Sequence, residues 1–253
     1  MTARVFLLVV CVSVRAAPPP ELASGLEHLK AQGSYSWEEI NADPGPVAQR
    51  FETRRGKVTV VQQNTSPHVI GSIDRNGDTL IQRDWQDGLR LDTIITASGG
   101  VVTKTPDGWM TEQEILSALA GERLQAGNGT TPRLAWLRRA DRPNLRRPDQ
   151  ELVPMLKSVS EFKADGESYV TSSQIPPEVS GTGSAIDITL TINLRRGLIR
   201  DYEVKIEATR RVSGVRVEVP ISDQRIVILT YLPIAAIAIP EEAREKLPAP
   251  VRP

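Results

Sequence analysis

The chain has 253 residues, of which 40% are hydrophobic and 25% charged, with 31 basic and 31 acidic residues. These values are typical of a globular protein, and a formal net charge of zero gives no general attraction to nucleic acid. Because only 4% of the residues are aromatic, the core is expected to consist mainly of aliphatic side chains.

The first 16 residues have the pattern of an export signal. Arg4 precedes a ten-residue apolar stretch, residues 5–14, and residues 14–16 have the form of a cleavage motif, which predicts cleavage between Ala16 and Ala17. The stretch is shorter than the roughly 20 residues of a membrane-spanning helix, so the mature chain is expected to have no transmembrane segment. Cleavage leaves 29 basic and 31 acidic residues, a formal charge of −2. The protein is therefore expected to be periplasmic or secreted; the alternatives are an uncleaved anchor or an apolar start that occurs by chance.

Cysteine usage agrees with a bacterial envelope protein. Cys11 is the single cysteine and lies inside the predicted signal. The mature chain is then expected to have no disulfide, no thiolate nucleophile and no cysteine-ligated metal.

The first half of the mature chain predicts a helix followed by short strands. Residues 21–32 carry leucines at helical spacing, and residues 34–40 place Tyr35 and Trp37 on one face of a strand, with Glu38 and Glu39 on opposite faces. Residues 51–62 predict one further strand. Two hairpins are expected next, formed by residues 69–73 with 79–84 and by residues 89–97 with 101–105.

The loop of the first hairpin, residues 74–78, has a second interpretation. Its acidic side chains suggest a calcium site, but an EF-hand loop starting at Asp74 needs glycine at its sixth position and glutamate at its twelfth. Thr79 and Trp85 stand there instead. Asn76-Gly77 is a strong hairpin signal, and the hairpin is the favoured interpretation.

A helical insert follows a turn at residues 106–109. Thr111 and Glu114 form a capping box for a helix that extends to about residue 124, and further helices are predicted at residues 132–140 and 151–158. Five arginines lie between residues 138 and 147. They predict either an anion-binding cluster or a solvated loop balanced by nearby acids.

The second half returns to strands. Residues 160–174 predict a pair with a turn at residues 164–166. Residues 186–194 alternate apolar and polar side chains, a glycine turn at Gly197 leads into residues 198–210, and further strands are expected at residues 215–219 and 225–232. The apolar run from Ile226 to Leu229 predicts burial on both faces. Residues 240–247 predict a short closing helix.

These elements predict an α+β fold with a strongly curved antiparallel β-sheet, a half-barrel, covered by a few short helices. The expected organisation is a signal peptide at residues 1–16, one half-barrel domain at residues 17–247 and a proline-rich tail at residues 248–253.

The sequence offers few groups for catalysis. The two histidines, His28 and His68, lack metal-ligand spacing, and no phosphate-binding glycine loop occurs. Ser66 with His68 would give an esterase, but no nucleophile-elbow motif is present. We therefore expect no catalytic residue, no metal and no cofactor, and we expect that the protein is not an enzyme.

The order of elements resembles the periplasmic lipoprotein-carrier superfamily of LolA-like and LppX-like proteins. The resemblance rests on the strand containing Tyr35 and Trp37, on Gly197-Leu198-Ile199-Arg200 opening a strand, and on Ile239-Pro240-Glu241-Glu242-Ala243 after the closing strand. It implies a half-barrel that holds acyl chains.

On this basis the leading hypothesis is non-enzymatic binding of a lipid or a lipidated protein in an apolar cavity, with arginines near the mouth contacting the head group. The predicted lining residues are Tyr35, Trp37, Trp109, Ile188, Ile206 and Ile228. The same side chains can instead simply fill the core. A protein-interaction or stress-sensing module, with a filled core and an exposed edge strand as its contact, is therefore the alternative.

Overall fold

The computed structural model describes residues 17–41, 47–53, 56–62, 66–126, 129, 131–141, 146–157, 159, 161–175, 185–212 and 217–248. The predicted export signal and all but the first residue of the predicted tail lie outside these residues. Both remain predictions.

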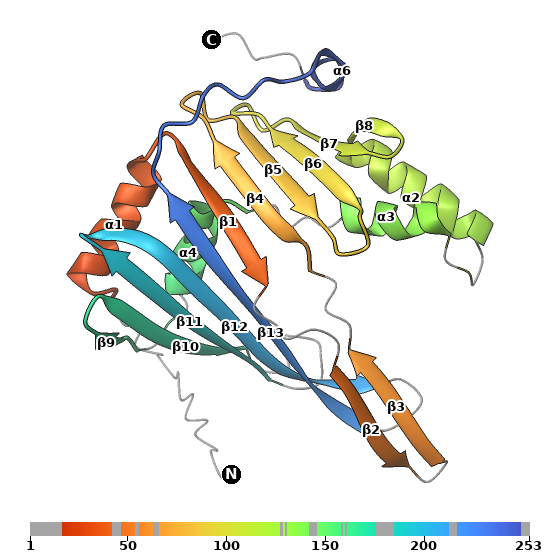
Figure 1. Cartoon of the computed structure of the whole chain (residues 1–253), viewed down its shortest axis with the longest axis horizontal. Helices are drawn as coiled ribbons and strands as arrows, with labels where there is room; N and C mark the ends of the chain where they lie inside the picture. Colours follow the sequence, from red (N-terminus) through yellow and green to blue (C-terminus); the bar gives the residue numbers. More distant parts are fainter. Residues whose placement is uncertain are drawn as a thin grey trace, which may run out of the picture.

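Eleven of the described strands form one curved antiparallel sheet that is not closed into a barrel (Figure 1). The predicted α+β class is confirmed. The strands, in chain order, are β1 (Tyr35–Asn41), β4 (His68–Ile73), β5 (Thr79–Asp84), β6 (Arg90–Ile95), β7 (Val101–Thr105), β8 (Gly108–Thr111), β9 (Lys163–Asp165), β10 (Ser168–Ile175), β11 (Ile186–Arg195), β12 (Leu198–Val212) and β13 (Val217–Thr230). A separate two-stranded sheet contains β2 (Val47–Thr53) and β3 (Gly56–Gln62).

Strand β1 joins two meanders. The order in the sheet is β8-β7-β6-β5-β4-β1-β13-β12-β11-β10-β9, so that β1 pairs with β4 on one side and with β13 on the other. In Figure 1 it lies between the yellow-orange strands and the blue strands. The strands that come first and last in the sequence of this sheet, β1 and β13, are therefore hydrogen-bonded neighbours.

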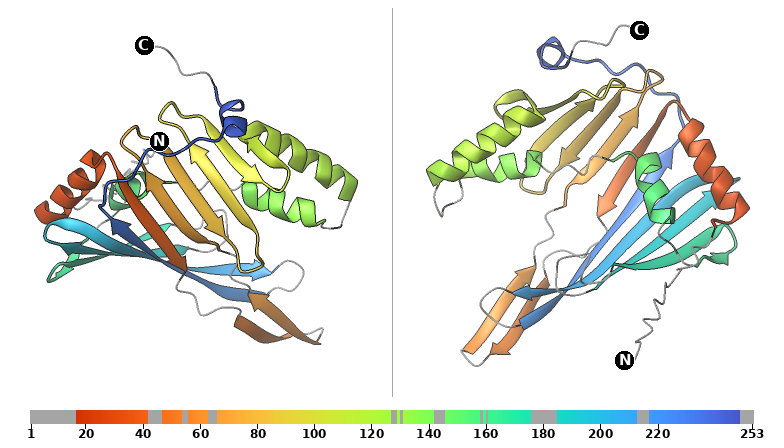
Figure 2. Two further views of the ribbon diagram at one scale, coloured as in Figure 1. Left: turned by 45° about the horizontal axis from the view of Figure 1, so that its top comes forward. Right: turned by 180° about the vertical axis from the view of Figure 1, so that it is seen from behind.

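The helices are α1 (Pro20–Ala31), α2 (Glu112–Ala126), α3 (Pro132–Ala140), α4 (Pro148–Lys157) and α6 (Glu241–Arg244). Helices α1 and α4 pack on one face of the sheet, called here the inner face (Figure 2, right). Leucines of both helices and the inward side chains of β1, β4, β5 and β10–β13 form the main core. Helices α2 and α3 form a second core with Trp85 and Leu91, and Ala243 of α6 packs with Ile94 and Val102 on the outer face.

The turns and caps follow the local sequence signals. Gly77 has a φ of 85° and the Asp74 carboxylate accepts the amide hydrogens of Asn76 and Asp78, which confirms the hairpin interpretation of this loop. At the start of α2 the Thr111 hydroxyl accepts from the Glu114 amide at 3.2 Å, and the Glu114 carboxylate accepts from the Thr111 amide at 2.8 Å. The predicted capping box is confirmed.

Four predictions of secondary structure are wrong. The turn predicted at residues 164–166 is displaced, because Ala164 and Asp165 belong to β9 and pair with Tyr169 and Ser168. Residues 51–62 are not one strand, because they contain the end of β2 and all of β3, with Thr53 opposite Gly56. Residues 106–109 contain the start of β8 rather than only a turn. The strands predicted at residues 215–219 and 225–232 are one strand, β13, because β12 pairs with it without interruption from Val217 to Ile228.

Pro220 explains why β13 looks interrupted in the sequence. Proline cannot donate to a neighbouring strand and is tolerated where one side of a strand is free. Strand β1 pairs with β13 only from Arg225 onward, so Pro220 is paired on the β12 side alone among the described strands. The missing N–H therefore costs little at this position.

Candidate functional site

The inner face of strands β10–β12 has a buried end and a more open end. Inward side chains under α1 and α4, including Tyr169, Ile192 and Tyr202, are at most 7% exposed. Farther along the same strands the apolar inward side chains are half-buried; they are Ile175, Ile186, Ile188, Ile206 and Ala208. We call these five residues the open end. An apolar surface that is half-exposed beside a closed core is a place where an apolar group can bind.

The buried end is filled by the protein's own side chains. Leu22, Leu26 and Leu29 of α1 and Leu152 and Leu156 of α4 are at most 8% exposed and pack directly on the strands. Between α4 and β10–β11 a cavity of about 30 Å³ remains, lined by Met155, Val159, Thr171, Ser172, Ser173, Ile188 and Leu190. That volume holds one or two waters or a small side chain, whereas pockets for small molecules have roughly 300–1,000 Å³.

A polar network ties the first turns of α4 to the sheet. The Tyr202 hydroxyl donates to Glu151 at 2.7 Å, and the Arg225 guanidinium donates to Glu39 at 2.9 Å and also to Glu151. The Tyr35 hydroxyl donates to Asp149 at 2.6 Å. Burial raises the pKa of the Tyr202 and Tyr35 hydroxyls, so both stay protonated donors at neutral pH.

Two opposing effects set the charges in this network. Burial raises the pKa of Glu39 above its ordinary value, although Arg225 acts in the opposite direction. Burial by itself lowers the pKa of Arg225, but Glu151 and Glu39 more than offset this and raise it. Arg225 is therefore a firmly charged cation between two carboxylates.

The raised pKa of Glu39 predicts a pH-dependent difference between the protein and its Glu39→Gln variant. Because the folded-state pKa of Glu39 is raised, the folded protein binds the Glu39 proton more tightly than the unfolded chain does. The stability that this proton gives is present at low pH and is lost as pH rises from the ordinary pKa through the raised one. We expect the free energy of unfolding of the unmodified protein to fall relative to that of the variant as pH rises above the ordinary pKa of a glutamate. Urea unfolding of both proteins at increasing pH measures the difference; a relative gain with rising pH would contradict the prediction.

Arg83 occupies an inward position on β5 and is 5% exposed. Its guanidinium donates to the Arg139 carbonyl near the end of α3 at 3.3 Å and to the Thr93 hydroxyl at 3.1 Å. It lies 5.6 Å from the centre of the Trp85 ring, against which Arg139 also packs. Burial lowers the pKa of Arg83 to about 10, which leaves it charged at neutral pH. Its charge thus faces the carbonyl end of α3, where a cation is stabilising.

The arginines between residues 138 and 147 are partly engaged in ion pairs. Arg139 pairs with Asp87 at 2.7 Å and Arg147 with Asp149 at 2.9 Å. Arg138 and Arg146 are exposed, and Arg142 lies outside the described residues. Of the described arginines in this cluster, Arg138 and Arg146 are thus the more accessible to an external anion.

The structure brings together four of the six predicted lining residues. Tyr35 and Trp37 are in the main core, and Ile188 and Ile206 pack against it on the inner face. The other two lie elsewhere. Trp109 packs with Ile94 and Val102 in the cluster beside α6, and Ile228 is 36% exposed while its neighbours Val227 and Leu229 are buried.

The prediction that residues 226–229 are buried on both faces is therefore wrong. Ile228 pairs with Glu38, and both residues have the parity of the outer face. Residues 226–229 place apolar side chains on both faces of β13. No described helix covers the outer face there, so Ile228 stays exposed.

The charged members of the inner face were missed by sequence reasoning. Glu39 has the same strand parity as Tyr35 and Trp37, and Arg225 the same parity as Val227 and Leu229. A charge at a position where the alternation requires a core side chain is the signal that could have found them.

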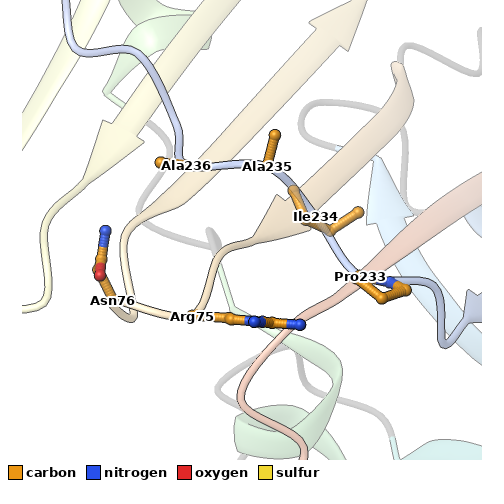
Figure 3. A pocket seen from close by; sticks show the side chains of 6 residues that line it. All are labelled: Arg75, Asn76, Pro233, Ile234, Ala235 and Ala236. Carbon is orange, nitrogen blue, oxygen red and sulfur yellow. The ribbon is translucent and has the colours of Figure 1, made fainter.

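A second hollow lies outside the inner face. It has a volume of about 510 Å³ and is open to solvent, between Arg75 and Asn76 of the β4–β5 turn and residues 233–236 (Figure 3). Two side chains hold the C-terminal segment beside this turn. Ser34 accepts from the Ile234 amide and Asp74 from the Ile237 amide, both at 2.8 Å. The hollow is shallow and contains none of the predicted lining residues.

His68, which was considered as a general base, lies on the outer face. Its Nε2 is 2.8 Å from the Glu38 carboxylate, and both side chains are more than 40% exposed. Among the described residues, no group of three or more histidine, cysteine, aspartate or glutamate side chains has the geometry of a metal site.

Comparison with protein-family models found no match, and comparison with curated proteins found no relative. Within the described part of the chain, no helix has both the length and the apolar character needed to cross a membrane.

Proposed function

We propose that this chain is a non-enzymatic extracytoplasmic binding protein that takes an acyl chain or another lipid tail at the open end of its inner face. The observation that supports the proposal is the gradient of exposure along β10–β12. Ile175, Ile186, Ile188, Ile206 and Ala208 continue the apolar face of the core but are only half-buried.

The energetics favour a lipid tail at this surface. Each CH₂ group removed from water contributes about 0.8 kcal/mol, so a tail of a few carbons gains several kcal/mol by covering the isoleucines. The nearby polar groups of the inner face are engaged with one another, as in the Arg225–Glu39 and Tyr202–Glu151 contacts. This arrangement favours binding over catalysis.

The filled core favours a second candidate. Because α1 and α4 occupy the buried end and leave a cavity of about 30 Å³, a whole acyl chain does not fit beneath α4 in this conformation. A protein-interaction module with a filled core, which uses the exposed parts of the sheet, agrees with this observation.

A fluorescent fatty acid tests the first candidate. Dansylaminoundecanoic acid should bind with a saturable rise in emission, and Ile188→Glu or Ile206→Glu should weaken binding at least tenfold, because a charge then faces the tail. Tenfold corresponds to about 1.4 kcal/mol.

The matched control is Ile228→Glu, which places the same charge on the outer face and should leave binding unchanged. Native mass spectrometry of the gently purified protein should also show a co-purified lipid. Absence of saturable binding, or an equal loss in the Ile228 variant, would favour the second candidate.

A further inference from the structure

The open hollow beside the β4–β5 turn adjoins a second hollow. The first, of about 510 Å³, has Arg75 and Asn76 on one side and residues 233–236 on the other (Figure 3). The second has a volume of about 190 Å³ and is lined by Gln32, Gly33, Ser34, Arg75 and Pro233. Because Arg75 and Pro233 line both, the two hollows are neighbours. The first alone has the volume of a small-molecule site, roughly 300–1,000 Å³.

Both walls of the first hollow are held in place by buried side chains. The Asp74 carboxylate is fully buried, and it accepts two amides of its own turn as well as the Ile237 amide at 2.8 Å. The buried Ser34 hydroxyl accepts the Ile234 amide at 2.8 Å. The turn and the C-terminal segment are thus joined before any ligand arrives, so that binding requires little further ordering of the chain.

Arg75 is the one charged residue among those that line the two hollows. It is exposed, and within the described residues its side chain has no hydrogen bond and no ion pair. The adjacent Asp74 does not pair with it, because that carboxylate is buried and bound to backbone amides. A guanidinium without a partner is available to an external carboxylate, with which it forms two parallel hydrogen bonds.

The wall opposite Arg75 is apolar and accessible. Pro233, Ala235 and Ala236 are exposed, and Ile234 is half-buried. An apolar group placed against them removes apolar surface of both partners from water. One cation beside such a wall matches a ligand with one negative charge next to an apolar body. A phosphate group is matched less well, because phosphate sites usually combine several donors from cations or a helix N-terminus.

We propose that this hollow binds a small aliphatic or aromatic monocarboxylate. The carboxylate lies on the Arg75 guanidinium, and the apolar body lies along Pro233, Ala235 and Ala236. The hollow is outside the inner face and shares no residue with the open end. The inference therefore does not rest on the lipid binding proposed above.

The test is an NMR titration of the unmodified protein with octanoate. Octanoate should give saturable shifts of the amides of residues 75–76 and 234–236. Octylammonium, which has the same chain length and the opposite charge, and acetate, which lacks the apolar body, should each bind about fivefold more weakly or less. Each comparison removes one half of the proposed contact.

Protein variants test the two walls separately. Arg75→Gln should weaken octanoate binding about fivefold or more, and Arg75→Lys should retain part of it because the charge remains. Ala235→Glu should abolish saturable binding at the hollow, since its carboxylate repels the ligand and competes for Arg75. Arg123→Gln removes an exposed arginine from α2 and is the matched control, which should bind octanoate like the unmodified protein. All three positions are exposed, so the variants are expected to fold.

The same titration separates this site from the open end. Shifts confined to β10–β12, equal binding of octylammonium, or unchanged binding by Arg75→Gln would overturn the inference. The first of these results would leave the proposed lipid site standing. Shifts confined to the hollow would support the inference and count against a lipid tail at the open end.

Discussion

Gly71→Ala is expected to lower the free energy of unfolding by about 3 kcal/mol or more. A Cβ added at Gly71 would lie 2.0 Å from the Trp37 ring, and the indole, which is 4% exposed, covers the glycine within the core. Neither the ring nor the strand can move away without disturbing the packing of β1 and β4, because overfilled cores respond by strain. Urea unfolding measures the change, which should correspond to a fall in Tm of about 6–12 °C.

Two comparisons show that the loss comes from this contact. Gly33→Ala adds the same methyl group where no atom lies within 4 Å of the new Cβ and should change stability by less than about 0.5 kcal/mol. Trp37→Leu is destabilising by itself, but combined with Gly71→Ala it should cost clearly less than the sum of the single changes, because the steric conflict is gone. Additive effects would show that the Gly71–Trp37 contact is not the cause.

Much of the fold follows from local sequence. Alternation predicted β11 and β12, Asn76-Gly77 predicted the β4–β5 hairpin, and the Thr111–Glu114 capping box predicted the start of α2. Each signal acts within a few residues, so it is visible without knowledge of the partner strand or helix.

The position of β1 could not be read from such signals. It pairs with β13 through contacts such as Trp37 with Leu229, nearly 200 residues apart in the chain. Nothing in residues 35–41 specifies this partner, since the pairing is selected by how the whole sheet buries its inner face. For the same reason residues 215–219 and 225–232 were predicted as two strands, although β12 pairs with β13 continuously from Val217 to Ile228.

The candidate site was predictable in part. The parity of Ile188 and Ile206 places them on the face that also buries Leu190 and Val204, as expected from alternation. Alternation does not tell which part of that face is covered by a helix. The helix cover decides whether an inward apolar residue is part of the core or lies on the surface. Ile228 was predicted to line the cavity because it is apolar, but it lies on the outer face of the sheet and is 36% exposed.

Arg225→Met is expected to lower the free energy of unfolding by about 3–5 kcal/mol at pH 7.5, because it leaves two poorly solvated carboxylates without their cation. The side chains of Glu39 and Glu151 are 24% and 15% exposed, and both pair with Arg225. Burial already raises the pKa of Glu39 with Arg225 present, and removal of the cation raises it further. Protonation of the Glu39 carboxyl then relieves part of the penalty, so the variant should come closer to the unmodified protein as pH falls toward about 5.

The controls separate this network from ordinary surface pairs. Arg200→Met removes a cation that is 54% exposed and pairs with Asp201, and it should cost less than about 1 kcal/mol at either pH. Adding Glu39→Gln and Glu151→Gln to Arg225→Met should restore most of the lost stability, because the unpaired charges are then removed. Urea unfolding at the two pH values tests all three proteins. If Arg225→Met cost no more than Arg200→Met, or if its cost did not change with pH, the network would contribute nothing to the attachment of α4 to the inner face.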